Sequence, residues 1–528
     1  MASAAMEPSA ASSGWASDLL KMAPNTALLA GGNNMQYDQL LREASATAER
    51  LRKWNGGDDL EGKRVSVLCP PSADFAVSLL GTWMAGGVVV PMHYKHPSDE
   101  LQYYADQSES SLVIAHPDFY NTATALNKLV MTSDNRADEL AGYVDVDAEL
   151  DVDRLLALDA TSDVSRRALI LYTSGTTGRP KGVVHTHNGI NHAADDLITA
   201  WEWTADDKLL HFLPLHHMHG ILNKLICPLR VGATVEFTEA SAAKIWERML
   251  ASSDALPAPT TFMAVPTVYA KLNEYYDKMD PAEQAAASEA CQELRLFVSG
   301  SAALPSSVMT RFKEISGHTL LERYGMTEVC MALSNPLNGE RLEGHVGLPL
   351  PSVSARVVDE ATGAVVADGE TGELRLKGPG IFAEYFNNPE ATEKEFDEDG
   401  WFKTGDIVQR SMDEEGSPYK ICGRASVDII KSGGYKISAL DVEREILEHP
   451  SIGEVAVVGL EDDTWGEKVV AIVGLAEGAE ELTLAELREF CGGMAAYKLP
   501  TVLKIMPDGI PRNAMGKVNK KSLKKELF

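Results

Sequence analysis

Short apolar segments alternate with helix-like segments along most of this chain. Residues 168–171, 209–215 and 295–299 are largely apolar, and the last two lead into loops rich in His or Gly. Such segments, separated by polar loops and amphipathic stretches, are typical of buried strands that alternate with helices. The pattern therefore predicts an α/β fold with several layers.

The longest uncharged stretch, residues 75–94, is long enough by itself to cross a membrane. Gly86 and Gly87 interrupt it, and residues 88–90 are three valines directly before Pro91. We therefore expect a helix before the glycine pair and a short buried strand after it, rather than a membrane span.

The pattern changes after Arg424, where a compact α+β unit is expected. It consists of a helix over residues 439–449, strands over 454–460 and 469–475, and a second helix over 484–490. The predicted organisation is a flexible N-terminus (1–24), a large N-terminal domain (25–423), a hinge (424–428) and a small, mobile C-terminal domain (429–528).

Composition and charge indicate the number of domains and the classes of partner to expect. The chain has 528 residues, 45% of them hydrophobic, and a formal net charge of −29 at pH 7. A chain of this size should divide into at least two domains, and its acidic balance argues against binding nucleic acid or anionic membranes through bulk charge. The six cysteines form no Cys-x-x-Cys pair, which fits a reducing compartment. No Cys or Glu spacing completes a zinc motif with the histidine cluster at His211, His216, His217 and His219.

The N-terminus gives a weak indication of the compartment. Residues 1–24 are rich in Ala and Ser, but they contain Glu7 and Asp18 and only Lys21 as a base. This is a poor mitochondrial presequence, and it lacks the basic region and apolar core of a secretory signal. We expect a cytoplasmic protein, with a mitochondrial one left open if the N-terminus is incomplete or atypical.

The most informative segment is residues 172–182, YTSGTTGRPKG, which follow the predicted strand at 168–171. Its glycines let the backbone approach a ligand, its hydroxyls add donors and Lys181 supplies a point charge, so the segment suits a polyphosphate. The Walker pattern does not fit, because Lys181 is misplaced and no hydroxyl follows it. The candidate ATP-binding residues are Thr173, Ser174, Gly175, Thr176, Thr177, Gly178 and Lys181.

Four further motifs follow in order: ERYGMTE at 322–328, WFKTGD at 401–406, GR at 423–424 and PRNAMGK at 511–517. Together with residues 172–182, they resemble the motifs of the adenylate-forming superfamily, which contains acyl-CoA synthetases, luciferases and the adenylation domains of peptide synthetases. The resemblance covers nearly the whole chain. It implies that superfamily's fold, with a large N-terminal domain and a small mobile C-terminal domain.

The resemblance also implies a two-step reaction. A carboxylate attacks the α-phosphate of ATP to give an acyl-adenylate, and the thiol of coenzyme A then displaces AMP. Between the steps the small domain rotates, and Lys517 stabilises charge in the first step only. The other implied roles are adenine stacking by Tyr324, α-phosphate binding by Thr327, Mg²⁺ binding by Glu328, and ribose binding by Asp406 and Arg424.

The hinge departs from the commonest pattern of this superfamily. Relatives often place Asp or Lys two residues after the ribose arginine, whereas this chain has Ser426 there. The pivot residue is therefore left open. A similar Ser occurs in the malonyl-CoA synthetase branch, so the departure does not indicate a loss of function.

Arg323 is the main indication of the substrate. It directly precedes the Tyr-Gly-Met-Thr-Glu segment, close to the acyl pocket of the family, where an arginine can pair with a second carboxylate. The alternative is a structural ion pair with Glu322. Residues 213–220, 298–305 and 320–328 resemble the malonyl-CoA synthetase branch, which implies malonate and methylmalonate as substrates. That resemblance places His217 at the entrance between the acid and thiol sites, and Ser299, Ser301, Arg323 and Met326 in the acid pocket.

The leading hypothesis is an AMP-forming malonate–CoA ligase of fatty acid and lipid metabolism. The alternatives are a ligase for another short or medium-chain carboxylate and a catalytically silent nucleotide-binding protein. The motifs alone do not exclude a luciferase-like oxygenase. A peptide-synthetase module would need a carrier domain, whereas the chain ends at Phe528 soon after the lysine loop. Small molecules are the only partners expected, and the oligomeric state is left open.

Overall fold

The computed structural model describes residues 19–22, 25–30, 33–133, 152, 155, 165–173, 179–251, 257–412, 416–476, 478–479, 481–512 and 518–528. The chain forms two compact units. Unit 1 comprises Met1–Thr173, Pro180–Ala240 and Pro379–Pro389, and unit 2 comprises Ser174–Arg179, Ser241–Gly378 and Glu390–Phe528.

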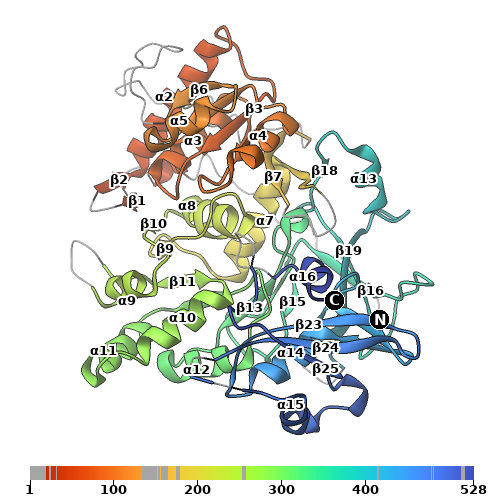
Figure 1. Cartoon of the computed structure of the whole chain (residues 1–528). Coiled ribbons are helices and arrows are strands. Elements are labelled where there is room, and N and C mark those ends of the chain that lie inside the picture. Colours follow the sequence, from red (N-terminus) through yellow and green to blue (C-terminus); the bar gives the residue numbers. More distant parts are fainter. Residues whose placement is uncertain are drawn as a thin grey trace, which may run out of the picture. The chain divides into compact units, whose positions relative to one another are not determined.

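Unit 1 contains a seven-stranded sheet with the strand order β18-β8-β7-β4-β3-β5-β6 (Figure 1). Strands β7, β4, β3, β5 and β6 are parallel, and β8 runs antiparallel to both β7 and β18. The strands are β3 (Arg64–Leu68), β4 (Val88–Pro91), β5 (Leu112–Ala115), β6 (Leu129–Thr132), β7 (Arg167–Tyr172), β8 (Gly182–Thr186) and β18 (Glu384–Tyr385). The accompanying helices are α2 (Tyr37–Trp54), α3 (Ala73–Met84), α4 (Ser98–Gln107), η1 (Pro117–Phe119), α5 (Tyr120–Thr124) and α7 (His187–Ala200).

Unit 1 also contributes four strands in the order β9-β10-β1-β2. Strand β10 is parallel to β9 and β1, whereas β2 is antiparallel to β1. These strands are β1 (Thr26–Ala30), β2 (Asn33–Gln36), β9 (Lys208–His211) and β10 (Thr234–Phe237). The π-helix η2 (His219–Ile226) and helix α8 (Cys227–Val231) follow β9. Because π-helical turns are rare and often mark functional sites, η2 directs attention to the histidines around it.

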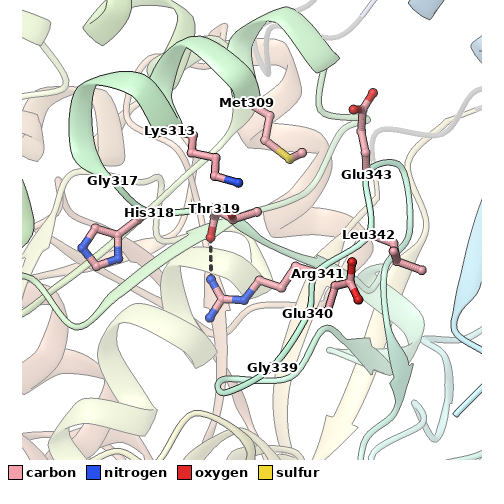
Figure 2. Close-up of a pocket in the computed structure, with 10 residues that line it drawn as sticks. All are labelled: Met309, Lys313, Gly317, His318, Thr319, Gly339, Glu340, Arg341, Leu342 and Glu343. Atoms are coloured by element: carbon pink, nitrogen blue, oxygen red, sulfur yellow. Dashed lines mark hydrogen bonds between the residues drawn. The ribbon is translucent and has the colours of Figure 1, made fainter. Parts of the chain in front are cut away.

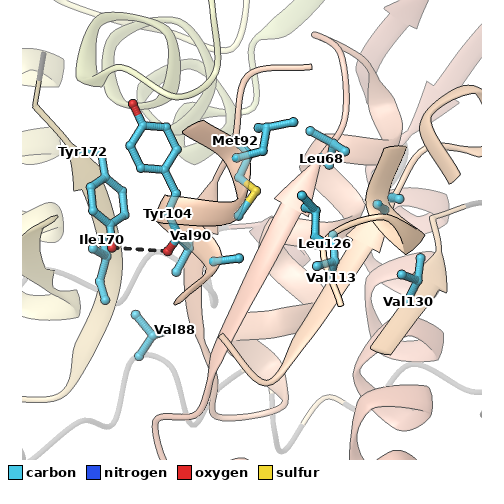
Figure 3. Close-up of a cluster of buried hydrophobic side chains, with 14 of the residues drawn as sticks. Leu68, Val88, Val90, Met92, Tyr104, Val113, Leu126, Val130, Ile170 and Tyr172 are labelled. Atoms are coloured by element: carbon cyan, nitrogen blue, oxygen red, sulfur yellow. Dashed lines mark hydrogen bonds between the residues drawn. The ribbon is translucent and has the colours of Figure 1, made fainter. Parts of the chain in front are cut away.

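A hydrophobic core anchors the strand that precedes the predicted phosphate segment. Leu68, Val90 and Val113 pack in a buried cluster with Ile170 and Tyr172 of β7 (Figure 3). Each fully buried aliphatic side chain stabilises the fold by about 1.5–3 kcal/mol. The Tyr172 hydroxyl also donates to a backbone carbonyl of α4 at 3.3 Å. The predicted strand at 168–171 is confirmed as part of β7, and it holds the start of the next segment in place.

The predicted α/β element in residues 75–94 is confirmed. Helix α3 ends at Met84 and strand β4 begins at Val88. Gly86 lies between them with a φ of 84°, in the left-handed region that favours glycine. In the described part of the chain, no helix is long and apolar enough to cross a membrane.

Unit 2 begins with strands in the order β15-β14-β13-β12-β11 and continues with a four-stranded antiparallel sheet, β16-β17-β19-β20. The strands are β11 (Thr261–Ala264), β12 (Leu296–Ser299), β13 (Leu321–Tyr324), β14 (Leu333–Ser334), β15 (Leu348–Pro349), β16 (Ser354–Val358), β17 (Thr371–Lys377), β19 (Phe402–Arg410) and β20 (Tyr419–Arg424). The helices are α9 (Ala242–Leu250), α10 (Pro266–Tyr276), α11 (Pro281–Gln292), α12 (Ser306–Ser316), η3 (Thr327–Val329) and α13 (Pro389–Lys394).

The last part of unit 2 contains the predicted α+β elements. A sheet in the order β22-β21-β24-β23, with β25 paired to β24, has its own core. Its elements are β21 (Ile429–Ser432), β22 (Tyr435–Ser438), α14 (Ala439–Leu447), β23 (Ile452–Asp462), β24 (Gly466–Leu475), α15 (Leu484–Phe490), η4 (Cys491–Gly493), η5 (Ala496–Lys498), β25 (Val502–Ile505) and α16 (Lys520–Leu527). The predicted helices and strands are therefore confirmed, and the predicted domain boundaries stay predictions.

A partly buried charge cluster joins three elements of this part. Lys520 of α16 forms ion pairs with Asp428 and, at 2.7 Å, with Glu443 of α14. The other Asp428 oxygen accepts from the Arg424 backbone N–H at 3.0 Å. Although burial opposes it, the two carboxylates raise the pKa of Lys520. The cluster therefore fixes the predicted hinge segment to both helices.

Candidate active site

Three of the predicted nucleotide ligands converge in unit 2. Asp406 of β19 and Arg424 of β20 are direct partners in the register of the two strands. Arg424 Nε donates to Asp406 Oδ1 at 2.9 Å, and the Tyr324 hydroxyl, at the end of β13, donates to Oδ2 of the same carboxylate. The Met326 sulfur lies 3.8 Å from that hydroxyl. Residues from three distant segments thus meet at one carboxylate.

The electrostatics of this group favour binding of a polar ligand. Burial opposes the charge of Arg424, but Asp406, Tyr324 and Glu328 together raise the pKa of Arg424 above its usual value. Burial likewise raises the pKa of Tyr324, so its hydroxyl stays a donor. Because a carboxylate has about four acceptor sites and Arg424 and Tyr324 occupy three of those of Asp406, about one site is left for a ligand hydroxyl.

Thr327 and Glu328 lie in η3, directly after a tight turn. A Cβ at Gly325 would lie 2.1 Å from the carbonyl oxygen of Cys330, so only glycine fits there. The turn buries Glu328, which contributes to the raised pKa of Arg424. No group of three or more His, Cys, Asp or Glu forms a metal site within the described ranges. A single buried carboxylate still suits Mg²⁺, which is commonly held by one or two carboxylates together with substrate phosphates.

Arg323 is a buried cation whose hydrogen bonding is incomplete. It is 3% exposed, and burial lowers its pKa to about 9, so it remains charged near pH 7. Nη2 donates to Ser301 Oγ at 3.2 Å, whereas Nε has no hydrogen-bond partner among the described residues. Gly300 leaves room for it, because a Cβ there would lie 2.7 Å from the guanidinium carbon. Such a cation, with a neutral partner only, suits an anionic ligand.

Glu322, the alternative partner of Arg323, lies on the other face of β13. Side chains alternate along a strand, and Ser299 of β12 is opposite Glu322 in the register. The pKa of Glu322 is raised to about 7. Burial is the largest cause, and the nearby cation Arg444 acts in the opposite direction. Ser299 is fully buried, and its hydroxyl has no partner in the described part of the chain. The structure therefore brings Ser301, but not Ser299, into contact with Arg323.

The predicted phosphate segment is described only at its ends. The Thr173 backbone N–H donates to the Lys181 carbonyl at 3.0 Å, and the Lys181 N–H donates to Thr173 Oγ1 at 3.3 Å. Lys181 Nζ lies 3.8 Å from the ring centroid of Tyr385, a distance typical of a cation–π contact. Outside the described residues lie Ser174, Gly175, Thr176, Thr177, Gly178 and Lys517. Their roles stay predictions.

His217 belongs to a group of four neighbouring imidazoles in unit 1. Its ring centroid lies 3.8 Å from that of His216, which is 4.6 Å from His93 and 5.1 Å from His96. Burial, with neighbouring cations, lowers the pKa of His93 to about 4 and holds that of His216 well below its usual value. Sequence reasoning missed His93 and His96. Their position just beyond the carboxyl end of parallel strand β4 is a signal that could have found them.

Of the other predicted histidines, His211 has a clear structural role. It is fully buried, and its Nε2 lies 3.0 Å from the carbonyl oxygen of Gly220, at the start of η2. This contact fits the packing and hydrogen-bonding role predicted for the histidines other than His217.

A separate pocket of about 520 Å³ lies beside α12 (Figure 2). None of the predicted site residues lines it. Arg341, the arginine in its wall, donates to the backbone carbonyls of Thr319, Pro336 and Leu337 at up to 3.1 Å. The guanidinium therefore holds the loops around the pocket together.

Two family models match the chain. The model of the AMP-binding enzyme matches residues 20–386, and that of the AMP-binding enzyme C-terminal domain matches residues 441–517. This chain therefore belongs to the family of AMP-binding enzymes. The predicted adenylate-forming superfamily, α/β fold and class of AMP-forming acid–CoA ligases are confirmed.

Known relatives and solved structures are similar to this chain over most of its length. The mitochondrial malonate–CoA ligase of Bos taurus is 46% identical over 94% of this chain and 87% of its own length. The malonate–CoA ligase of Arabidopsis thaliana is 42% identical over 95% of this chain and 86% of its own length. Among solved structures, ATP-bound MatB from Rhodopseudomonas palustris has a TM-score of 0.81 and 31% identity, covering 97% of this chain and 98% of that one.

Proposed function

We propose that this chain is an AMP-forming malonate–CoA ligase, which makes malonyl-CoA from malonate, ATP and CoA through an acyl-adenylate. The observation that carries the proposal is the buried guanidinium of Arg323, which among the described residues donates to the neutral hydroxyl of Ser301 and pairs with no carboxylate. The distal carboxylate of malonate supplies the missing anion, whereas an alkyl tail would leave the cation desolvated and unpaired. The relatives named malonate–CoA ligases support the same substrate.

In the first step, a carboxylate oxygen of malonate attacks the α-phosphorus of ATP, and pyrophosphate leaves. Arg323 and Ser301 hold the distal carboxylate, which fixes the direction of the reacting one. Mg²⁺ bound at Glu328 would neutralise phosphate charge. The remaining roles in this step are assigned to Thr173, Lys181 and Lys517 at the phosphates, Thr327 at the α-phosphate, Tyr324 at adenine, and Asp406 and Arg424 at the ribose.

In the second step, the thiol sulfur of CoA attacks the acyl carbon, the bond from that carbon to the phosphate oxygen breaks, and AMP leaves with the electron pair. The thiol proton passes to solvent. His217 lines the entrance used by the thiol, and the small domain turns about residues 424–428 between the steps. This step needs neither Lys517 nor a covalent enzyme nucleophile.

The decisive experiment is an AMP-release assay with purified full-length protein, ATP and CoA. The acids compared are acetate, malonate, methylmalonate, succinate and octanoate. We expect malonate to give the highest kcat/KM, with acetate and octanoate lower by about two orders of magnitude or more, because neither pairs with the buried cation. Equal use of octanoate and malonate would contradict the proposal.

Methylmalonate is proposed as a second substrate. It keeps both carboxylates and adds only a methyl group, which changes binding by about 1 kcal/mol. A malonyl-CoA ligase solved as a ternary product complex with methylmalonyl-CoA and AMP has a TM-score of 0.64 and 34% identity to this chain, covering 93% of it. The ratio of kcat/KM for the two acids measures this preference directly.

The compartment is a separate proposal. Several animal relatives carry the word mitochondrial in their names, whereas residues 1–24 of this chain contain Glu7 and Asp18 and a single base, Lys21. We propose the cytoplasm, with mitochondria as the alternative that these relatives support. Imaging of the chain with a C-terminal fluorescent tag distinguishes the two.

A further inference from the structure

The strand that carries Asp406 is interrupted by a bulge at that residue. In the register of β17 and β19, Glu373 is opposite Ile407, but Arg375 is opposite Lys403. Residues 404–406 therefore stand against the single residue Leu374. Bulges of this kind redirect a side chain and are common beside active sites.

Several backbone groups in the bulge have partners outside the β17–β19 ladder. The Asp406 N–H donates to Thr404 Oγ1 at 3.0 Å, and the Thr404 hydroxyl donates to the Leu374 carbonyl at 2.7 Å. The Thr404 carbonyl accepts from Arg424 Nη2 at 3.2 Å. The Gly405 carbonyl accepts from a backbone N–H at 2.9 Å. The N–H of Gly405, at the centre of the bulge, needs an acceptor as well.

Glu373 supplies the acceptor for the Gly405 N–H. Its Oε1 accepts from the Gly405 N–H at 3.3 Å, and Oε2 accepts from Arg375 Nε at 3.1 Å. Glu373 is 9% exposed, so these two donors replace its hydration. Gly405 has a φ of 69°, a left-handed conformation that the bulge requires.

Arg375 is itself held in place. Its Nη1 donates to Asp397 Oδ2 at 2.9 Å, and Asp397 Oδ1 accepts from the Trp401 N–H at 2.9 Å. The connection from Trp401 to Gly405 is thus tied to β17 at both ends by one chain of charged side chains. Glu373 is the member of that chain that contacts the bulge.

We propose that Glu373 is the positioning residue that aims Asp406 at the ribose of ATP and so sets the selectivity for ribonucleotides. The inference rests on the proposed function, in which Asp406 accepts the ribose hydroxyls. Glu373 does not touch the nucleotide. It acts through the Gly405 N–H and the backbone of the bulge.

The test compares three full-length variants with the wild type. Glu373→Ala removes both acceptors, whereas Glu373→Gln keeps a carbonyl oxygen for the Gly405 N–H. Glu370→Ala is the matched control, because Glu370 is exposed and lies just before the same strand. For each protein, kcat/KM is measured with ATP, 2′-deoxy-ATP and 3′-deoxy-ATP, and with malonate at saturating ATP. Calorimetry gives the Kd of the same nucleotides.

The expected readout is the ratio of kcat/KM with ATP to kcat/KM with each deoxy analogue. A hydrogen bond to a carboxylate makes this ratio about ten- to a hundredfold in the wild type. In Glu373→Ala the ratio falls to about threefold or less while KM for malonate stays unchanged, and Glu373→Gln and Glu370→Ala keep the wild-type ratio. Glu373→Ala with an unchanged ratio, or with equal losses for all three nucleotides, overturns the inference.

Two further outcomes distinguish a failure of the ribose assignment from a failure of the substrate assignment. A wild type with no ribose preference refutes Asp406 as a ribose ligand and overturns the role of Glu373 with it. A wild type that prefers ATP over deoxy-ATP but forms no AMP from malonate refutes only the proposed substrate, and the calorimetric ratio then decides on Glu373. If Glu373→Ala does not fold, Gly405→Ala strains the same bulge and must lower the same ratio for the inference to stand.

Discussion

Replacing Arg323 by methionine tests the substrate assignment most directly. The wild-type guanidinium is buried, and among the described residues its hydrogen-bond partner is the neutral hydroxyl of Ser301. Losing its pair with the distal carboxylate of malonate should cost about 2–5 kcal/mol, by analogy with charge pairs broken at interfaces. At 1.4 kcal/mol per factor of ten, kcat/KM for malonate should fall by roughly 30- to 4,000-fold. Methionine fills similar space with an apolar chain, so butyrate activity should hold or rise.

The assay follows AMP release with malonate and with butyrate in the wild type, Arg323→Met and Arg311→Met. Arg311 is the control because it is exposed and pairs with Asp277 and Glu314 on the surface, where such pairs contribute little. Thermal unfolding adds a second readout. Malonate should raise the Tm of the wild type but not of Arg323→Met, because it binds the native site only when the cation is present. A parallel fall of both activities would refute the pairing and favour a structural role.

Three other predictions test separate parts of the mechanism. Lys517→Ala should abolish adenylate formation but spare thioester formation from supplied malonyl-AMP, and equal losses in both half-reactions would count against the assigned role. Glu328→Gln should raise the Mg²⁺ concentration needed for half-maximal activity without lowering Tm, and an unchanged Mg²⁺ dependence would remove Glu328 from the site. Burial, with neighbouring cations, lowers the pKa of His93 to about 4 and those of His187 and His211 to about 3, so the unfolded chain binds more protons below its ordinary pKa of 6.5. The free energy of unfolding, measured in urea, should therefore fall from pH 7 to pH 5 by up to about 1.4 kcal/mol per pH unit for each ring, and His187→Gln should reduce that slope.

The sequence predicted the elements whose signal is local. The apolar residues of β7, the glycine pair after α3 and the amphipathic pattern of α14 each depend on neighbours within one element, so periodicity was enough. The convergence of Tyr324, Asp406 and Arg424 was expected only through family resemblance, because nothing local brings three distant segments together.

The parts that the sequence could not predict depend on register and on long-range packing. Ser299 is expected to help define the acid pocket, which stays a prediction, and the sequence did not reveal that the pairing of β12 with β13 places it on the face of Glu322. The bulge that aims Asp406 arises from the slip between β17 and β19, which no residue pattern in either strand reveals. His93 and His216 approach each other because two separate strands end near the same place, which needs the fold itself.

The charge cluster at Lys520 has a consequence for synthesis on the ribosome. Asp428 emerges 92 residues before the lysine that neutralises it, which at 5–20 residues per second is a delay of roughly 5 to 20 s. During that time Asp428 and Glu443 cannot be buried without a large desolvation cost. The charge pairing of Asp428 and Glu443 with Lys520 can therefore be completed only after the last helix has been translated. A chain that stops before Lys520 lacks both ion pairs, and we expect it to be less stable than the full-length chain even though nearly all of its core residues are present.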